Sequence, residues 1–300
     1  MSSDVRFVKQ EDIDKTKWNS CVHFASHGHL YGYMWYLNNV AREWDALIEG
    51  DYETVFPLFK KRQFGRGSSL YQPDLVRETG IYSNNILSAK RIEKMLKAIP
   101  KEYENIDLVL NEGVKPPPNL GFDISTQVNH QLLLKFKYEE LAGGYSPQVN
   151  EELAKAMKND LIITSNVKPE KIADFYKKYT KDKKNVEKKF HAYQRIMYNA
   201  LHRGWGFASG ISLPNGEICA AAFFVFSHGR LLRLVSSVSP IGKEKGAEAL
   251  TYDMILRTNA DRHLILDFNS GNQDFDPTIF GAQAVHAYRI QKKKKVLGIF

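Results

Sequence analysis

VSSVSPIGKEKGAEALTYDMILRTNADRHLILDF, residues 235–268, is the stretch that decides the fold of this chain. A serine-rich strand end is followed by the glycine-containing lysine segment 242–247, which is expected to be a loop. A helix is expected over Glu248–Thr258 and a buried strand over Leu264–Phe268. A strand, a glycine-containing loop and a helix N-terminus in this order present free backbone N–H groups and a positive dipole, which suit a pyrophosphate. An ordinary strand–helix connection with solvated lysines is the alternative.

Three apolar strands precede this stretch and are expected to form an antiparallel meander. The first two, Trp205–Leu213 and Ile218–Ser227, flank the dipeptide Asn215-Gly216, which is typical of tight hairpins. The third strand, Leu231–Ser237, follows a second turn that contains Gly229. A meander, a helix and a further strand predict an α+β domain with a mixed sheet.

The first half of the chain shows a similar order. Two apolar segments, Trp44–Ile48 and Thr54–Phe59, are expected to pair as a hairpin around a Gly-Asp turn. Pro57 lies inside the second segment, and proline predicts an edge position or a bulge there. A helix is expected over Ser88–Ile99 and a buried strand over Ile106–Leu110.

A cluster of turn residues, Gly143-Gly144-Tyr145-Ser146-Pro147, interrupts the pattern near the middle of the chain. We therefore expect two domains, residues 1–146 and 147–300. Further strands are expected over Gln131–Phe136, before this boundary, and Val285–Ile290, near the C-terminus. The two halves repeat a pattern of elements without visible sequence similarity, and this predicts an α+β fold in duplicate.

The composition is that of a folded protein with a basic surface. The 300 residues are 43% apolar and 25% charged, with a formal net charge of +8 and a pI near 9.2. A positive field favours anionic partners such as phosphorylated cofactors, nucleotides, RNA or lipid headgroups. The basic segment Lys177–Lys189 is interleaved with Tyr176, Tyr179 and Phe190, which fits either an RNA-binding face or, as the preferred interpretation, the buried stripe of a helix.

Metal, disulfide and secretion signals are not found. Cys21 and Cys219 are too far apart for a disulfide framework, and no ligand set completes the cluster of His23, His27 and His29, so no metal is expected. The sequence has neither a P-loop nor a dinucleotide fingerprint. The N-terminus does not resemble a signal peptide, and the longest apolar run is too short to cross a bilayer. A cytoplasmic location is therefore expected.

The order of meander, glycine-containing loop, helix and the strand Leu264–Phe268 resembles the core of a GNAT-superfamily acyltransferase. In that family the strand before the loop hydrogen-bonds the pantetheine arm, and the loop holds the pyrophosphate. Lys243, Gly246 and Glu248 match the loop positions, with glutamate in place of the last small residue. The resemblance implies a donor site at these residues: Ser236, Ser237, Val238, Lys243, Lys245, Gly246 and Ala247.

A second resemblance covers the whole chain. The run Leu266-Asp267-Phe268-Asn269-Ser270-Gly271, followed by Phe280-Gly281-Ala282 and Tyr288, resembles the C-terminal signature of the double-domain Fem-type and BioF2-like acyltransferases, relatives of peptidoglycan aminoacyltransferases. First-half segments that share the resemblance are Trp35-Tyr36-Leu37, Trp44-Asp45-Ala46-Leu47-Ile48 and Tyr71-Gln72-Pro73. It implies two GNAT-like domains, with the donor site in the second.

Acyl transfer to an amine needs a neutral amine, an oriented ester or thioester, and stabilisation of the oxyanion. The backbone N–H groups around Ser237 and Val238 are the candidates for binding the carbonyl oxygen. Asp267 or Asn269 is the candidate for the acceptor amine, and Tyr288 for protonating the leaving group. The alternatives are structural: Asp267 caps the adjacent loop, and Tyr288 is packed with its hydroxyl at the surface.

The sequence thus predicts an N-acyltransferase without a tightly bound cofactor. Its co-substrate would be acyl-CoA or aminoacyl-tRNA, and its acceptor an amine, such as that of a peptidoglycan precursor, bound in a cleft between the domains. The alternative is a non-catalytic GNAT-like protein that binds a nucleotide or tRNA.

Overall fold

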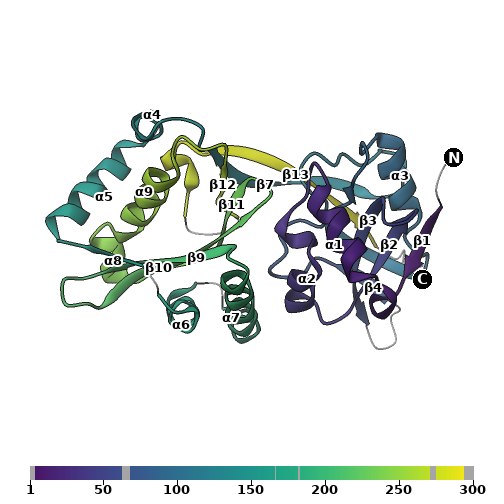
Figure 1. Cartoon of the computed structure of the whole chain (residues 1–300), viewed down its shortest axis with the longest axis horizontal. Helices are drawn as coiled ribbons and strands as arrows, with labels where there is room; N and C mark the ends of the chain where they lie inside the picture. The colour runs from purple at the N-terminus through teal and green to yellow at the C-terminus, as the bar shows by residue number, and fades with distance from the viewer. Residues whose placement is uncertain (1–3, 63–67, 166, 182, 271–274, 294–300) are drawn as a thin grey trace, which may run out of the picture. The chain divides into compact units, whose positions relative to one another are not determined.

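The computed structural model describes residues 4–62, 68–165, 167–181, 183–270 and 275–293 (Figure 1). The chain forms two compact units, one of residues 1–128 with 286–300 and one of residues 129–285. It passes from the first unit to the second within strand β7 (Asp123–Leu133) and returns within strand β13 (Gln283–Lys292). The units therefore meet along the chain at these two strands, and residue 146 lies inside the second unit.

The first unit is a mixed sheet with short helices. Its strands are β1 (Val5–Val8), β2 (Trp44–Glu49), β3 (Thr54–Arg62), β4 (Ser68–Tyr71), β5 (Tyr82–Ser83), β6 (Tyr103–Val109) and the last part of β13. Its helices are η1 (Gln10–Asp12), α1 (Lys15–Phe24), η2 (Leu30–Gly32), α2 (Met34–Val40) and α3 (Ala89–Lys97). The strand order is β1-β2-β3-β4-β6-β13, with β5 beside β3, and the β4–β6 pair is parallel.

The expected first hairpin is confirmed as the antiparallel pair β2 and β3. Pro57 pairs with Ala46 on β2. On its other side, β3 pairs with β5 at residues 54–55 and with β4 at residues 60–62, so Pro57 falls between the two pairings. Pro57 therefore lies at a locally unpaired edge of β3, as the sequence predicts, and its missing N–H removes no hydrogen bond to β4 or β5.

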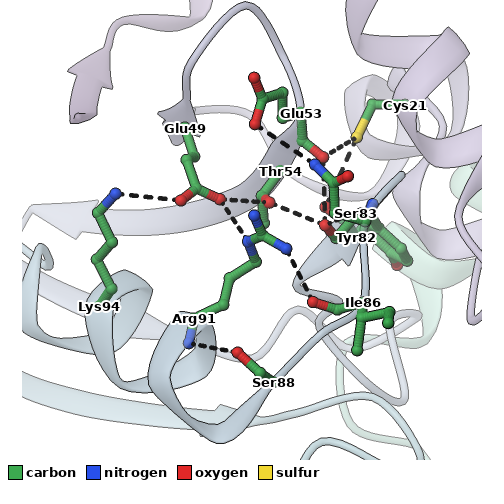
Figure 2. A network of polar contacts seen from close by, with 11 residues as sticks. Cys21, Glu49, Glu53, Thr54, Tyr82, Ser83, Ile86, Ser88, Arg91 and Lys94 are labelled. Atoms are coloured by element: carbon green, nitrogen blue, oxygen red, sulfur yellow. Dashed lines mark hydrogen bonds and ion pairs between the residues drawn. The ribbon is translucent and has the colours of Figure 1, made fainter. Parts of the chain in front are cut away.

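A buried carboxylate connects the hairpin to α3 (Figure 2). Glu49, at the end of β2, is 4% exposed and accepts hydrogen bonds from Thr54 Oγ1 at 2.7 Å, Arg91 Nε at 2.8 Å and Lys94 Nζ at 3.1 Å. Thr54 also shares a hydrogen bond with Ser83 on β5. The network thus joins four elements, the hairpin strands β2 and β3, strand β5 and helix α3.

The second unit has the meander expected from the sequence. Its strands are β7, β8 (Ile162–Ser165), β9 (Gly206–Ser212), β10 (Ile218–Ser227), β11 (Arg230–Val238) and β12 (Ile265–Asp267). Its helices are α4 (Tyr138–Gly143), α5 (Pro147–Lys158), α6 (Pro169–Tyr179), α7 (Val186–His202), α8 (Pro240–Glu244), α9 (Ala247–Asn259) and η3 (Pro277–Phe280). The strand order is β7-β12-β11-β10-β9-β8, with β11 and β12 parallel.

Helices cover both faces of this second sheet. Figure 1 shows α5 and α9 on one face, and α6 and α7 on the other. The core under α9 is built from both strands and helix, and its large members include Phe224, Leu231, Tyr252, Leu256, Leu266, Phe268 and Phe280. The expected α+β class, a mixed sheet flanked by helices, is confirmed.

Two expectations about elements are wrong. Residues 240–244 form the helix α8 where a loop was expected, because Ser239 Oγ caps it by accepting from Gly242 N at 3.1 Å and Pro240 occupies its first turn. The strand expected over Gln131–Phe136 is β7, which begins at Asp123 and ends at Leu133. Most of residues 123–128 are exposed, so they lack the apolar run by which a buried strand is identified.

Among the residues that the structure describes, no helix has the length and apolar character needed to cross a membrane.

Candidate functional site

Strands β11 and β12 separate in the middle of the second sheet. Their parallel pairing runs from Arg230 opposite Ile265 to Leu232 opposite Asp267. β12 ends there, whereas β11 continues for six residues to Val238. The edge of β11 that faces β12 is therefore open to other partners beyond Leu232. Ligands of α/β folds often bind where neighbouring strands diverge.

A β-bulge marks the same point of β11. Phe223 of β10 lies opposite Val235, but Phe224 lies opposite Arg233, so Leu234 is the additional residue. Bulges redirect side chains and are frequent near functional sites. Beyond the bulge, Ser239 N donates to Cys219 O.

Because an antiparallel ladder alternates, the N–H of Ser237 also faces β10, and those of Ser236 and Val238 face the open edge. Of the two N–H groups expected to bind the carbonyl, that of Val238 is thus directed toward the divergence.

A small cavity lies between this part of β11, β10 and α9. Its free volume is about 10 Å³, the space of about one water molecule. The residues that line it are Ala220, Ala221, Ser236, Ser237, Val238, Glu248, Thr251 and Tyr252. The fold thus brings together the three β11 residues expected at the donor site and adds three residues of α9. A pantetheine arm needs far more room than this cavity offers.

A buried arginine stands behind the cavity. Arg233 is 2% exposed, and its Nη1 donates to Tyr252 Oη at 2.6 Å and approaches Ser236 Oγ at 3.4 Å. Tyr252 Oη and Ser236 Oγ are 3.2 Å apart and share a hydrogen bond. The guanidinium also lies over the Phe275 ring, 5.2 Å from its centroid. Burial raises the pKa of the Tyr252 phenol, while the charge of Arg233 acts in the opposite direction.

The segment expected to hold a pyrophosphate is mostly packed against the protein. Lys243 is exposed on α8, and Lys245 Nζ donates to Asn159 Oδ1 at the end of α5 at 2.6 Å. Gly246, the residue before α9, has φ +79°, and a Cβ atom there would lie 2.0 Å from the carbonyl oxygen of Glu152. Ala247 is fully buried. The start of α9 is therefore covered by α5 on the side of Gly246.

Asp267 is held by groups of the second unit. It is 3% exposed, and its Oδ1 accepts from Asn129 Nδ2 and from the backbone N of Asn269, each at 2.8 Å. Its Oδ2 lies 3.7 Å from Arg230 Nη1. Asn269 has a positive φ of 46°, and its Nδ2 donates to the carbonyl oxygen of Arg233, across the divergence of the strands. Asp267 thus caps the adjacent loop through Asn269 N, which is the structural alternative given above. Asn269 itself lies where β11 and β12 diverge.

Tyr288 belongs to the other unit. It lies on β13, where its carbonyl oxygen accepts from Leu110 N of the first unit. Gly271 and Asp274, which belong to or follow the signature run, lie outside the described residues.

Two residues of β7 complete the surroundings of Asp267, and no sequence signal marked them. Asn129 Oδ1 accepts from Ser270 N at 3.0 Å, and His130 Nδ1 shares a hydrogen bond of 2.8 Å with Ser270 Oγ. Arg233 and Tyr252 were also missed. A signal for Arg233 was present, because a charged residue inside the apolar run 231–235 needs a buried partner.

The basic segment is partly core and partly surface. Tyr176 is buried, as the preferred interpretation expects, while Tyr179 and Phe190 are half-buried beside lysines: Lys178 lies 5.0 Å from the Tyr179 ring centroid and Lys177 lies 5.2 Å from that of Phe190.

The three clustered histidines contact protein groups. His23 contacts the Tyr33 hydroxyl, His27 the carbonyl oxygen of Ile81, and His29 the N–H of Tyr31. Within the described part of the chain, no three His, Cys, Asp or Glu side chains form a metal-binding group.

Comparison with known proteins identifies the fold. No family model matches the sequence, and no curated protein matches it in sequence. Among solved structures, FemX superposes with a TM-score of 0.64 at 10% identity, covering 92% of this chain and 96% of that one. A conserved protein of unknown function from Bacteroides thetaiotaomicron gives 0.59 at 12% identity, covering 94% and 98%. L-PGS from Bacillus licheniformis gives 0.54 at 10% identity, covering 95% and 93%.

The chain therefore shares its fold with FemX and L-PGS over most of its length. At identities of 10 to 12% the likeness is one of fold, and the chemistry has to be argued from this chain's own residues.

Proposed function

We propose that this protein is an N-acyltransferase of the Fem-type or BioF2-like kind, built from two GNAT-like domains, with its donor site in the second unit. It would move an acyl or aminoacyl group from a CoA thioester or an aminoacyl-tRNA to an amine. The acceptor class we propose is an amine such as that of a peptidoglycan precursor, and the cell compartment we propose is the cytoplasm.

The observation that carries the proposal is the divergence of β11 and β12 beside a cavity whose lining includes Ser236 and Tyr252. The open edge of β11 offers the N–H of Val238, and Ser236 and Tyr252 offer hydroxyl donors. Hydrogen-bond donors that meet at one small volume are what a developing oxyanion requires. Asn269 marks the other side of the divergence through its bond to Arg233 O.

Of the two donors, aminoacyl-tRNA agrees better with the α8–α9 segment. A CoA pyrophosphate would need the N–H groups at the start of α9, but Gly246 is packed against Glu152 O. An aminoacyl ester needs no diphosphate cradle. Lys243 and Lys245, which were expected to help bind a phosphate group, lie in the α8–α9 segment, and Lys243 is exposed.

The experiment is a transfer assay with hydroxylamine as a small general amine. Purified protein is incubated separately with acetyl-CoA and with a total tRNA pool charged with radiolabelled amino acids, and the hydroxamate formed above the protein-free rate is measured. We expect transfer from the charged tRNA pool. Transfer from acetyl-CoA that is lost in Lys243→Ala/Lys245→Ala would assign the donor to CoA, and no transfer from either donor would contradict the proposal.

The small cavity and the covered start of α9 also favour a second candidate, a GNAT-like protein that binds a nucleotide or tRNA without catalysis. Saturable binding of uncharged tRNA, together with no hydroxamate from the charged pool, would support this function.

A further inference from the structure

The hydroxyls of Ser236 and Tyr252 lie at the cavity and are joined to each other and to Arg233 by hydrogen bonds. Arginine has only N–H donors, so in the 2.6 Å contact Arg233 donates and Tyr252 Oη accepts. Ser236 and Tyr252 then share one hydrogen bond, which uses one of their two hydroxyl protons. Whichever residue donates in it, the other proton remains, and it is not donated to any other described residue. The cavity that both residues line is where this proton can be used.

The size of the cavity limits what accepts that proton. A free volume of about 10 Å³ holds about one water-sized group. A single oxygen atom fits this enclosed space, and any larger group has to extend out of it.

The charges near the cavity limit the accepting group further. Glu248 is one of the residues that line the same cavity, and its negative charge acts against a ligand that arrives with a full negative charge. A neutral carbonyl oxygen meets no such penalty. The guanidinium of Arg233, behind the hydroxyls, stabilises negative charge that develops later on that oxygen.

We propose that Ser236 and Tyr252 form a hydroxyl donor pair that binds the carbonyl oxygen of the transferred acyl group, with Arg233 as its positioning residue. This inference rests on the proposed function. When the amine attacks, the new N–C bond forms and the electron pair of the carbonyl double bond moves to the oxygen. The hydroxyl of the Ser236–Tyr252 pair that keeps its proton donates a hydrogen bond to this oxygen. When that pair returns, the bond to the thiol sulfur or ribose oxygen breaks, and the leaving group takes up the proton that the amine loses.

Arg233 acts through Tyr252 and does not reach the carbonyl oxygen itself. Its hydrogen bond fixes the phenol oxygen as an acceptor, so the phenol proton is directed away from the arginine. Burial raises the pKa of Tyr252 and keeps the phenol protonated at neutral pH, which a donor requires. The stacking of the guanidinium on Phe275 holds its plane.

The test measures kcat and KM for hydroxamate formation in the full-length protein, with the donor that the wild type uses. Tyr252→Phe and Ser236→Ala remove one hydroxyl each and preserve the shape of the core. We expect each to lower kcat by roughly 100-fold while KM stays within about threefold, because a donor to the oxyanion acts mainly in the transition state. Arg233→Met is expected to lower kcat similarly, and Arg233→Lys, which keeps the charge, to recover part of the loss.

Matched controls separate this role from packing. Tyr145→Phe removes another buried phenol of the second unit, which bonds to Asp253, and Ser212→Ala removes a buried hydroxyl that bonds to Thr164. Both are expected to keep the wild-type kcat. An active wild type whose Tyr252→Phe and Ser236→Ala variants stay within twofold of its kcat overturns the donor pair and leaves the proposed function standing. A wild type inactive with both donors overturns both.

Discussion

At the scale of single residues, the two units each contain a buried charge whose neighbours decide its role. Arg233 in the second unit is surrounded by hydroxyl and aromatic groups at a strand divergence, which is why we assign it to function. Glu49 in the first unit is surrounded by Thr54, Arg91 and Lys94, which satisfy it as a structural ion pair. A charge inside a fold is informative only together with its partners.

Glu49 also makes the stability of the first unit depend on pH. Burial alone would raise the pKa of Glu49, but the hydrogen bonds from Thr54 and Lys94 and the charges of Arg91 and Lys94 hold it below its ordinary value. A lowered folded-state pKa contributes stability that is complete above the unfolded value of about 4.3 and is lost as the pH falls through the folded value. Glu49→Gln is expected to lower the free energy of unfolding by about 2 kcal/mol at pH 7 and to flatten its decline below about pH 4.3.

Urea unfolding across pH 3 to 7 measures this. Glu53→Gln is the matched control, because Glu53 lies close by but is exposed, and a change of about 0.5 kcal/mol or less is expected for it. An acid branch identical in Glu49→Gln and the wild type would show that the ion pair does not stabilise the unit.

At the scale of elements, the connection from β11 to α9 decides what the second unit can bind. Ser239 is the N-cap of α8, and Gly246 is the N-cap of α9. Gly246 adopts a left-handed conformation, which allows α9 to start shortly after α8 ends. Both caps are formed by residues next to the helices in sequence. The packing of α5 against Gly246, in contrast, brings together residues about 90 positions apart.

Replacing Gly246 tests how tightly α5 and α9 are packed. In Gly246→Ala, the positive φ and the overlap with Glu152 O act together, and we expect a loss of about 2–4 kcal/mol in the free energy of unfolding. Gly204→Ala is the control: its φ of +67° carries the backbone penalty, about 1 kcal/mol, but no atom lies within 4 Å of the added Cβ. Equal losses for the two variants in chemical denaturation would contradict the close packing.

At the scale of the whole molecule, the chain leaves the first unit and later returns to it. The second unit is one continuous segment, 129–285, whereas the first takes its last strand from the C-terminal part of the chain. That strand, β13, pairs with β6, and Arg289 forms a bidentate ion pair with Asp107, with both N···O distances 2.6 Å. This ion pair lowers the pKa of Asp107.

Fragments of the chain test whether each unit can fold without the other. Residues 129–285 are expected to fold alone and to melt cooperatively, because their core is complete. Residues 1–128 alone lack β13, one of the two strands that pair with β6, and are expected to give poorly dispersed amide NMR spectra. Joining residues 286–293 to that fragment through a flexible linker is expected to restore dispersion. A well-folded 1–128 fragment would show that β13 is dispensable for the first unit.

The sequence by itself determined the elements whose information is local. The meander β9–β11 follows from alternating apolar residues around Asn215-Gly216, and α9 and β12 follow from the period and length of their apolar runs. These patterns depend on residues close together in sequence, so they were sufficient to predict an α+β fold with a mixed sheet. Even α8 was readable, since Ser239-Pro240 is a helix start.

Only the tertiary structure decided which distant residues share a site and where the chain changes units. Strand β7 pairs through an exposed segment with no apolar signature, so neither its first residue nor the place of Asn129 beside Asp267 could be read locally. The partnership of Arg233 with Tyr252 likewise depends on how β11 packs against α9. Local patterns specify backbone conformation, whereas the direction and burial of a side chain are specified by elements that lie far away in sequence, and the chemistry of the site depends on those.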